Sequence, residues 1–130
     1  MNVPADLKYT RNDEWVRAAG NVGTIGITDY AQGQLSDIVF VEITVSADET
    51  IKAGDSVAAV ESVKAAAEVC SPVSGAVAAV NSALPDSPEQ VNSDAYGAAW
   101  MVQITLSDPA ELGKLMDAAA YEAYCQEREG

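Results

Sequence analysis

The sequence has 130 residues, 48% of them apolar, which is enough for one domain with its own hydrophobic core. Its 20 acidic and 7 basic residues give a formal charge of −13, which argues against binding to nucleic acid or to an anionic membrane surface. The sequence contains no histidine, so Ser-His-Asp and Cys-His catalytic sites and histidine metal sites are excluded. The composition does not favour a self-sufficient enzyme, and we expect neither a catalytic residue nor a metal site.

The two cysteines, Cys70 and Cys125, lack CxxC spacing and are predicted to be reduced, partly buried thiols. The N-terminal residues MNVPADLKYT have neither the apolar core of a secretory leader nor the character of a transit peptide. No apolar run approaches the length that spans a bilayer. We expect a bacterial cytoplasmic protein, although a processed chain from the mitochondrial matrix would look the same with a start Met.

Residues 7–27 alternate well enough to form two strands, at 15–17 and 22–27, around a turn at 19–21. Trp15 is expected in the core. Glu14 precedes it and would point the other way along the strand, where a solvated carboxylate is the simplest expectation.

A short helix is predicted next, with Thr28 as N-cap, Asp29 in its first turn and an end near residues 33–36. The following run DIVFVEITV, residues 37–45, is almost continuously apolar, which predicts a strand buried on most sides. Alternation would place Val39, Val41 and Ile43 on one face and Ile38 and Phe40 on the other.

A β-hairpin is predicted within residues 54–80, GDSVAAVESVKAAAEVCSPVSGAVAAV, with its turn near residues 63–66. This turn carries Lys64, whose neighbours in the chain are small or apolar. An exposed ammonium with no bulky neighbours could be gripped by another protein, so we interpret Lys64 as a recognition or modification point.

Residues 81–97 are expected to be an irregular connection with one helical turn near residues 88–91. A last strand, residues 99–106, would put Trp100, Val102, Ile104 and Leu106 on one face. Asp108, Pro109 and Glu111 supply an N-cap, an N1 proline and an N3 acid for a helix, and a second helix is expected over residues 118–127. The pattern predicts a mainly β sandwich with small peripheral helices.

The order of strand, E-S-V-K-A, strand, S-P-V-S-G, strand resembles the lipoyl/biotinyl carrier domains. This resemblance implies a flattened β-barrel or sandwich, a barrel-sandwich hybrid, with small helices after the N-terminal hairpin and near residues 108–127, formed by one domain over residues 1–130. It also implies that a cofactor acid is joined to Lys64 as an amide. Biotin carriers usually flank this lysine with methionines, whereas Val63 and Ala65 stand here, which favours lipoate.

Several longer segments together resemble the H proteins of the glycine cleavage system: KYTRNDEWV, IGITDYAQGQLSDIVFVE, ESVKAAAEVCSPVSG, DAYGAAWMVQI and SDPAELGKLMD. The resemblance implies a carrier whose lipoyl group accepts an aminomethyl group from a pyridoxal-phosphate glycine decarboxylase (P protein). A folate-dependent aminomethyltransferase (T protein) would then take the one-carbon unit, and dihydrolipoamide dehydrogenase (L protein) would reoxidise the dithiol. A lipoate-attaching enzyme would modify Lys64.

The resemblance further implies that the loaded arm rests in a cleft on the carrier, with Glu14 and Glu68 as candidates to hold its ammonium. Positions 13 and 34 depart from the common pattern: Asp13 stands where the family often has histidine, and Gln34 where it often has histidine or glutamate. Cys70 and Ala99 also replace more usual residues. These departures concern the resting cleft and leave the attachment lysine in place.

Three alternatives remain open on the sequence alone. The chain could be the lipoyl domain of a 2-oxoacid dehydrogenase, although it has no Ala/Pro-rich linker. It could be a relay protein that passes lipoate to other carriers. It could also be an unmodified β-rich interaction module, in which case no adduct would form on Lys64.

Overall fold

A computed structural model describes residues 2–129. The strands are β1 (Lys8–Tyr9), β2 (Glu14–Ala19), β3 (Val22–Ile27), β4 (Ile38–Ile43), β5 (Thr50–Ile51), β6 (Ser56–Ser62), β7 (Ala66–Cys70), β8 (Gly75–Val80) and β9 (Val102–Leu106). The α-helices are α1 (Asp29–Leu35), α2 (Gln90–Ser93) and α3 (Ala118–Glu129), and the 3-10 helices are η1 (Leu84–Asp86) and η2 (Pro109–Lys114).

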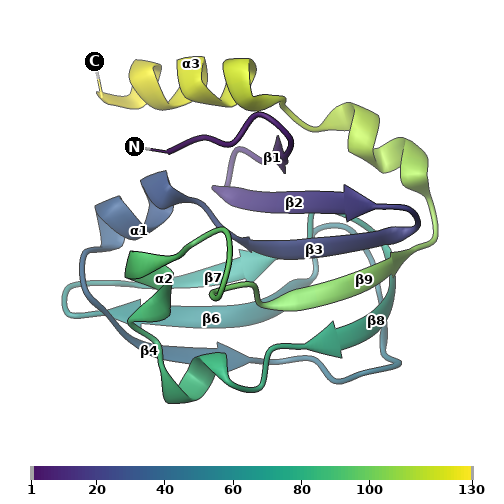
Figure 1. Ribbon diagram of the computed structural model, residues 1–130, viewed down its shortest axis with the longest axis horizontal. Coiled ribbons are helices and arrows are strands. Elements are labelled where there is room, and N and C mark those ends of the chain that lie inside the picture. Colours follow the sequence, from purple (N-terminus) through teal and green to yellow (C-terminus); the bar gives the residue numbers. More distant parts are fainter. Residues whose placement is uncertain (1, 130) are drawn as a thin grey trace.

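Two antiparallel sheets form the fold (Figure 1). The larger has the strand order β1-β2-β3-β9-β8-β5, and the smaller has the order β4-β6-β7. The sheets are separate and do not close into one barrel. The expected mainly β sandwich with small peripheral helices is therefore confirmed.

Neighbouring residues of β2 point to two different hydrophobic clusters. Val16 belongs to the main core, which contains apolar residues from both sheets and from the connections between them. Trp15 is fully buried, as expected, in a second cluster with Tyr9 and with Tyr121 of α3. The Tyr9 and Tyr121 rings stack with centroids 4.6 Å apart. The C-terminal helix therefore completes a core of its own over β1 (Figure 1).

The chain leaves the smaller sheet and enters the larger one between β7 and β8. Ser71 fixes this crossing: its hydroxyl donates to the Val73 carbonyl at 2.6 Å and accepts from the Val73 N–H at 3.2 Å. At Gly75 a Cβ atom would lie 1.9 Å from the Thr105 carbonyl oxygen of β9, so only glycine allows the strands to approach this closely.

The expectation that residues 37–45 are buried on most sides is wrong. Strand β4 is an edge strand, and a register shift between Ile38 and Phe40 breaks the simple alternation. Ile38 and Val41 are buried, whereas Val39 and Phe40 are 54% and 47% exposed. An apolar run identifies the strand, but the register shift and the packing against each face of the sheet decide which of its side chains are covered.

The helix expectations hold with local differences. The Thr28 hydroxyl accepts from the Ala31 N–H at 3.1 Å and caps α1 as predicted. Asp108 also caps, but the segment that it opens is a 3-10 helix, and Glu111 does not close a capping box. Glu111 instead accepts hydrogen bonds from the backbone N–H and the hydroxyl of Ser74.

The remaining elements lie close to their expected places. The irregular segment contains η1 and α2, and α3 begins at Ala118 as expected. The two-residue strands β1 and β5 were not expected. Across residues 2–129, the helices are too short or too polar to traverse a bilayer.

Candidate functional site

Lys64 lies in the tight turn between β6 and β7, as the sequence predicts. The Ser62 hydroxyl shapes this turn, because it accepts hydrogen bonds from the N–H groups of Lys64 and Ala65 at 3.2 and 3.0 Å. The Val63 N–H donates to the Asp37 carbonyl at 3.1 Å, which ties the turn to the residue before β4. The backbone that carries Lys64 is therefore held on two sides.

The turn presents its side chains to solvent. Lys64 and Ala65 are exposed, and Val63 is 68% exposed. Within residues 2–129, Lys64 takes part in no ion pair. A fixed backbone with a free, exposed ammonium leaves the lysine accessible to a modifying enzyme.

A groove lies beside this hairpin, between it, helix α1 and the turn that precedes β2. Its volume is about 170 Å³. The lining residues are Asn12, Asp13, Ile27, Ala31, Gln34, Leu35, Val60, Ala67, Glu68 and Val69. Most of them are apolar, and the two acids among them are Asp13 and Glu68. The groove can therefore accept an apolar chain that ends in a polar or cationic group.

Of the two acids expected to hold the arm, Glu68 lines the groove and is exposed. Glu14 is 2% exposed and is not among the lining residues, so the expectation of a solvated carboxylate at Glu14 is wrong. Its Oε1 accepts from the Thr10 hydroxyl at 2.6 Å, and its Oε2 accepts from the Cys70 N–H at 3.1 Å. Because Cys70 ends β7, Glu14 links the two sheets behind the groove. Burial raises the pKa of the Glu14 carboxyl, and the two hydrogen bonds oppose this rise.

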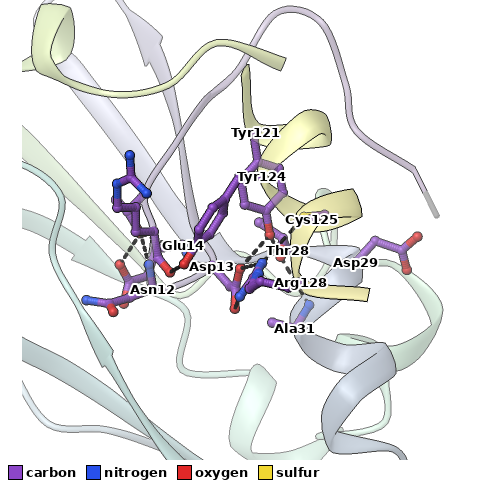
Figure 2. Close-up of polar contacts among 12 residues, drawn as sticks. Asn12, Asp13, Glu14, Thr28, Asp29, Ala31, Tyr121, Tyr124, Cys125 and Arg128 are labelled. Carbon is purple, nitrogen blue, oxygen red and sulfur yellow. Dashed lines mark hydrogen bonds and ion pairs between the residues drawn. The ribbon is translucent and has the colours of Figure 1, made fainter. Parts of the chain in front are cut away.

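Asp13, beside Glu14, is held by the C-terminal helix (Figure 2). Its Oδ1 accepts from the Tyr121 hydroxyl at 2.8 Å and from Arg128 Nη2 at 2.7 Å, and its Oδ2 accepts from Arg128 Nη1 at 3.1 Å. The Tyr121 hydroxyl also lies 2.7 Å from the Thr28 hydroxyl. Hydrogen bonding to Asp13 is the main cause that raises the pKa of the Arg128 guanidinium, which therefore stays charged. One groove acid is thus paired with a cation from α3.

The cysteines are free thiols, with Cys70 partly exposed and Cys125 1% exposed. Burial, followed by the negative charges of Glu14 and Glu68, raises the pKa of the Cys70 thiol. A thiol with a raised pKa is a poor nucleophile at neutral pH. Among the described residues there is also no cluster of three acidic or cysteine side chains that could hold a metal ion.

Sequence reasoning identified Lys64 and Glu68 but missed Arg128 and Tyr121 as neighbours of the groove. Asp13 was singled out only as a departure from a common pattern. Arg128 lies 115 residues from Asp13 in the chain, and no local signal joins them. The only available hints are the acid at position 13 and a basic residue just past the expected helix 118–127, which in the structure lies in the last turn of α3.

Comparisons with known proteins agree along nearly the whole chain. A family model described as Glycine cleavage H-protein matches residues 7–128. The glycine cleavage system H protein of Anaeromyxobacter sp. (strain K) is 49% identical over 129 residues, covering 99% of this chain and 100% of the relative. That of Burkholderia vietnamiensis (strain G4 / LMG 22486) is 55% identical over 121 residues, covering 92% and 94%.

A solved structure gives the same answer for the fold. The crystal structure of a glycine cleavage system H protein from Mycobacterium marinum superposes with a TM-score of 0.83 at 32% identity, covering 98% of this chain and 99% of that one. Family match, sequence identity and fold coincide over the same residues. The chain therefore belongs to the glycine cleavage H-protein family.

Proposed function

We propose that this protein is the lipoyl carrier of a glycine cleavage system, with lipoate joined as an amide to Lys64. The observation that supports this most strongly is the position of Lys64, exposed on a fixed hairpin turn in a chain of the H-protein family. Acylation removes the charge of the lysine and extends it into a long flexible arm. The protein acts as a carrier, and the chemistry is done by its partners.

The residues around Lys64 fit such an arm. Glu68 is four residues past Lys64, so it lies no more than about 14 Å away along the chain. Between them and α1 the groove offers apolar side chains, among them Ile27, Leu35 and Val60. A flexible arm attached to Lys64 can fold back over β7, with its methylenes against these side chains.

When bound, lipoate would supply the disulfide that is reduced as it takes up the aminomethyl group of glycine. Glycine decarboxylase would load the carrier, the aminomethyltransferase would unload it, and dihydrolipoamide dehydrogenase would reoxidise it. A lipoate-attaching enzyme would act on Lys64 first. Because the relatives described above are bacterial, we place these encounters in a bacterial cytoplasm.

The chain's own residues would shelter the arm between encounters. Glu68 stands on the groove wall, where its carboxylate can accept a charge-assisted hydrogen bond from an ammonium. Glu14 is 2% exposed and does not line the groove, but its carboxylate has acceptor sites left beside the bonds from Thr10 and Cys70. We therefore propose Glu68 as the first contact and Glu14 as a second, buried one.

Reconstitution tests this function. Lipoylated chain is mixed with the glycine decarboxylase, and glycine-dependent release of carbon dioxide is followed, with Lys64→Arg as the unlipoylated control. The proposal expects glycine-dependent release of carbon dioxide, in proportion to the amount of carrier, only with lipoylated wild type. A lipoylated protein that supports no glycine decarboxylation but passes lipoate to other carriers would identify a relay protein instead.

A further inference from the structure

The two acids that line the groove have opposite surroundings. Glu68 is exposed and, within residues 2–129, takes part in no ion pair. Asp13 has an 18% exposed side chain and accepts three hydrogen bonds from Tyr121 and Arg128. Two carboxylates that line the same groove thus differ in their freedom to meet a ligand.

Arg128 is itself firmly positioned. Its guanidinium lies 4.2 Å from the ring centroid of Tyr30 in α1 and 4.2 Å from that of Tyr124 in α3. Its Nη2 also lies 3.4 Å from the Cys125 sulfur. Cation–π contacts with these two rings and a bidentate ion pair with Asp13 hold the guanidinium in place. Arg128 thereby joins α3 to the groove wall (Figure 2).

The backbone of Asp13 is fixed as well. Its φ is +68°, a left-handed conformation that aspartate adopts more readily than most residues. The Asp13 carbonyl accepts from the Thr28 N–H at 2.9 Å, and its own N–H donates to the Thr10 carbonyl at 3.2 Å. Because the backbone is held at both sides, removal of Arg128 would leave the charge of the Asp13 carboxylate unpaired, with the Tyr121 hydroxyl as its remaining donor, without moving the turn.

We propose that Arg128 is a positioning residue of the groove: it holds the Asp13 carboxylate toward α3 and cancels its charge, leaving Glu68 as the free carboxylate of the groove wall. This inference rests on the proposed function, since it assigns the groove to a cationic arm. A cation between two free carboxylates is bound more tightly than a cation beside one. The pair with Arg128 therefore limits how strongly the groove holds its ligand, which suits a carrier that must also hand its cargo over.

The inference can be tested on the full, unlipoylated chain. The probe is hexylammonium, an apolar chain with a cationic end, titrated by NMR while the amide signals of residues that line the groove are followed. Arg128→Gln should bind it about two- to fivefold more tightly, as expected for one added exposed charge pair. Neutral 1-hexanol should bind all variants alike.

Three further variants separate charge from shape. Arg128→Lys keeps the cation and should bind hexylammonium like wild type. The double variant Arg128→Gln with Asp13→Asn replaces the ion pair by a neutral pair and should return to wild-type affinity. Lys114→Gln removes one cation from η2, away from the groove, and should change nothing. Added salt should abolish the gain of Arg128→Gln because screening weakens an exposed charge interaction.

A purely structural role for Arg128 predicts the opposite sign. If loss of Arg128 loosens the groove, Arg128→Gln binds hexylammonium more weakly or equally, and either result overturns the inference. Weaker binding by the neutral double variant also overturns it, because Asp13 would then contact the cation in the wild type. No lipoate is involved in this experiment, so a negative result leaves the assignment of lipoate to Lys64 untouched. That assignment is tested separately, by the intact mass of the chain and by reconstitution with the decarboxylase.

Discussion

Glu14 offers the sharpest prediction on stability, because its buried carboxylate joins the two sheets behind the groove. Oε2 accepts from the backbone N–H of Cys70 on β7, while Oε1 accepts from Thr10 before β2. Glu14→Gln removes the charge and keeps the bond from the Cys70 N–H, which the amide oxygen can accept. It loses the bond from Thr10, because the Thr10 hydroxyl already accepts from the N–H groups of Asn12 and Glu14. Glu14→Leu removes the charge and both bonds.

The difference between these two variants isolates the hydrogen bond from Cys70. In Glu14→Leu the Cys70 N–H loses its acceptor at a partly buried site, which costs about 1–3 kcal/mol. The Thr10 hydroxyl loses its acceptor in both variants, and because Thr10 is only partly buried it can turn toward water. The free energy of unfolding of Glu14→Leu should therefore be about 1–3 kcal/mol lower than that of Glu14→Gln at every pH, and its urea midpoint should be lower.

The pH dependence of the difference between wild type and Glu14→Gln isolates the charge, and its sign follows from the pKa. Burial raises the pKa of Glu14 in the folded protein above its ordinary value of 4.5. Between these two values the folded state binds more protons than the unfolded state, so this group's contribution to stability falls as pH rises. Wild type should lose stability relative to Glu14→Gln as pH increases from about 4.5, with no further change above the folded pKa.

Urea unfolding of both variants and wild type, followed by tryptophan fluorescence at a series of pH values, checks both differences. Glu122→Gln, at an exposed glutamate of α3, is the matched control for loss of one carboxylate and should leave the wild-type pH dependence in place. If the free energies of unfolding of wild type and Glu14→Gln change with pH in parallel, the inference that burial raises the pKa of Glu14 is refuted. Equal stability of Glu14→Gln and Glu14→Leu would refute the claim that the hydrogen bond between Glu14 and Cys70 stabilises the contact between the two sheets.

Three further predictions concern the complete reaction and the loss of the loaded group. The double variant Cys70→Ser with Cys125→Ser should support the complete reaction, because lipoate brings its own dithiol. A large loss of aminomethyl transfer in a variant that melts normally would contradict this prediction. The melting temperature must be checked first, because a polar group at buried Cys125 costs about 1–3 kcal/mol of stability. In lipoylated, aminomethyl-loaded protein, Glu68→Gln should speed formaldehyde release about two- to fivefold by removing an exposed charge pair. Glu14→Gln should also speed release, and an unchanged rate would mean that Glu14 only ties the sheets together.

Local patterns predicted much of this molecule because the features that they predict are themselves local. The turn at Lys64 follows from two β-rich runs separated by small residues, and the Thr28 cap follows from its own side chain and the N–H three residues on. Buried Trp15 follows from its size and from alternation along a strand. Each of these needs only neighbours in the chain.

Features that depend on distant pairing could not be predicted. Phe40 is exposed because β4 has a neighbour on one side only, which a single apolar run does not reveal. Glu14 is buried because β7 of the other sheet lies opposite it, 56 residues away. The pairing of Asp13 with Arg128 requires α3 to pack over β1, and neither residue carries a local signal for that contact.

The most direct test of the account is to locate the lipoyl group. The chain is produced with lipoate and the lipoate-attaching enzyme, and its intact mass and peptide map are measured beside those of Lys64→Arg, which keeps the charge but does not acylate readily. We predict one lipoyl adduct, on Lys64, and none in the folded Lys64→Arg variant. An adduct on Lys8, Lys52 or Lys114, or no adduct on the wild type, would contradict the account.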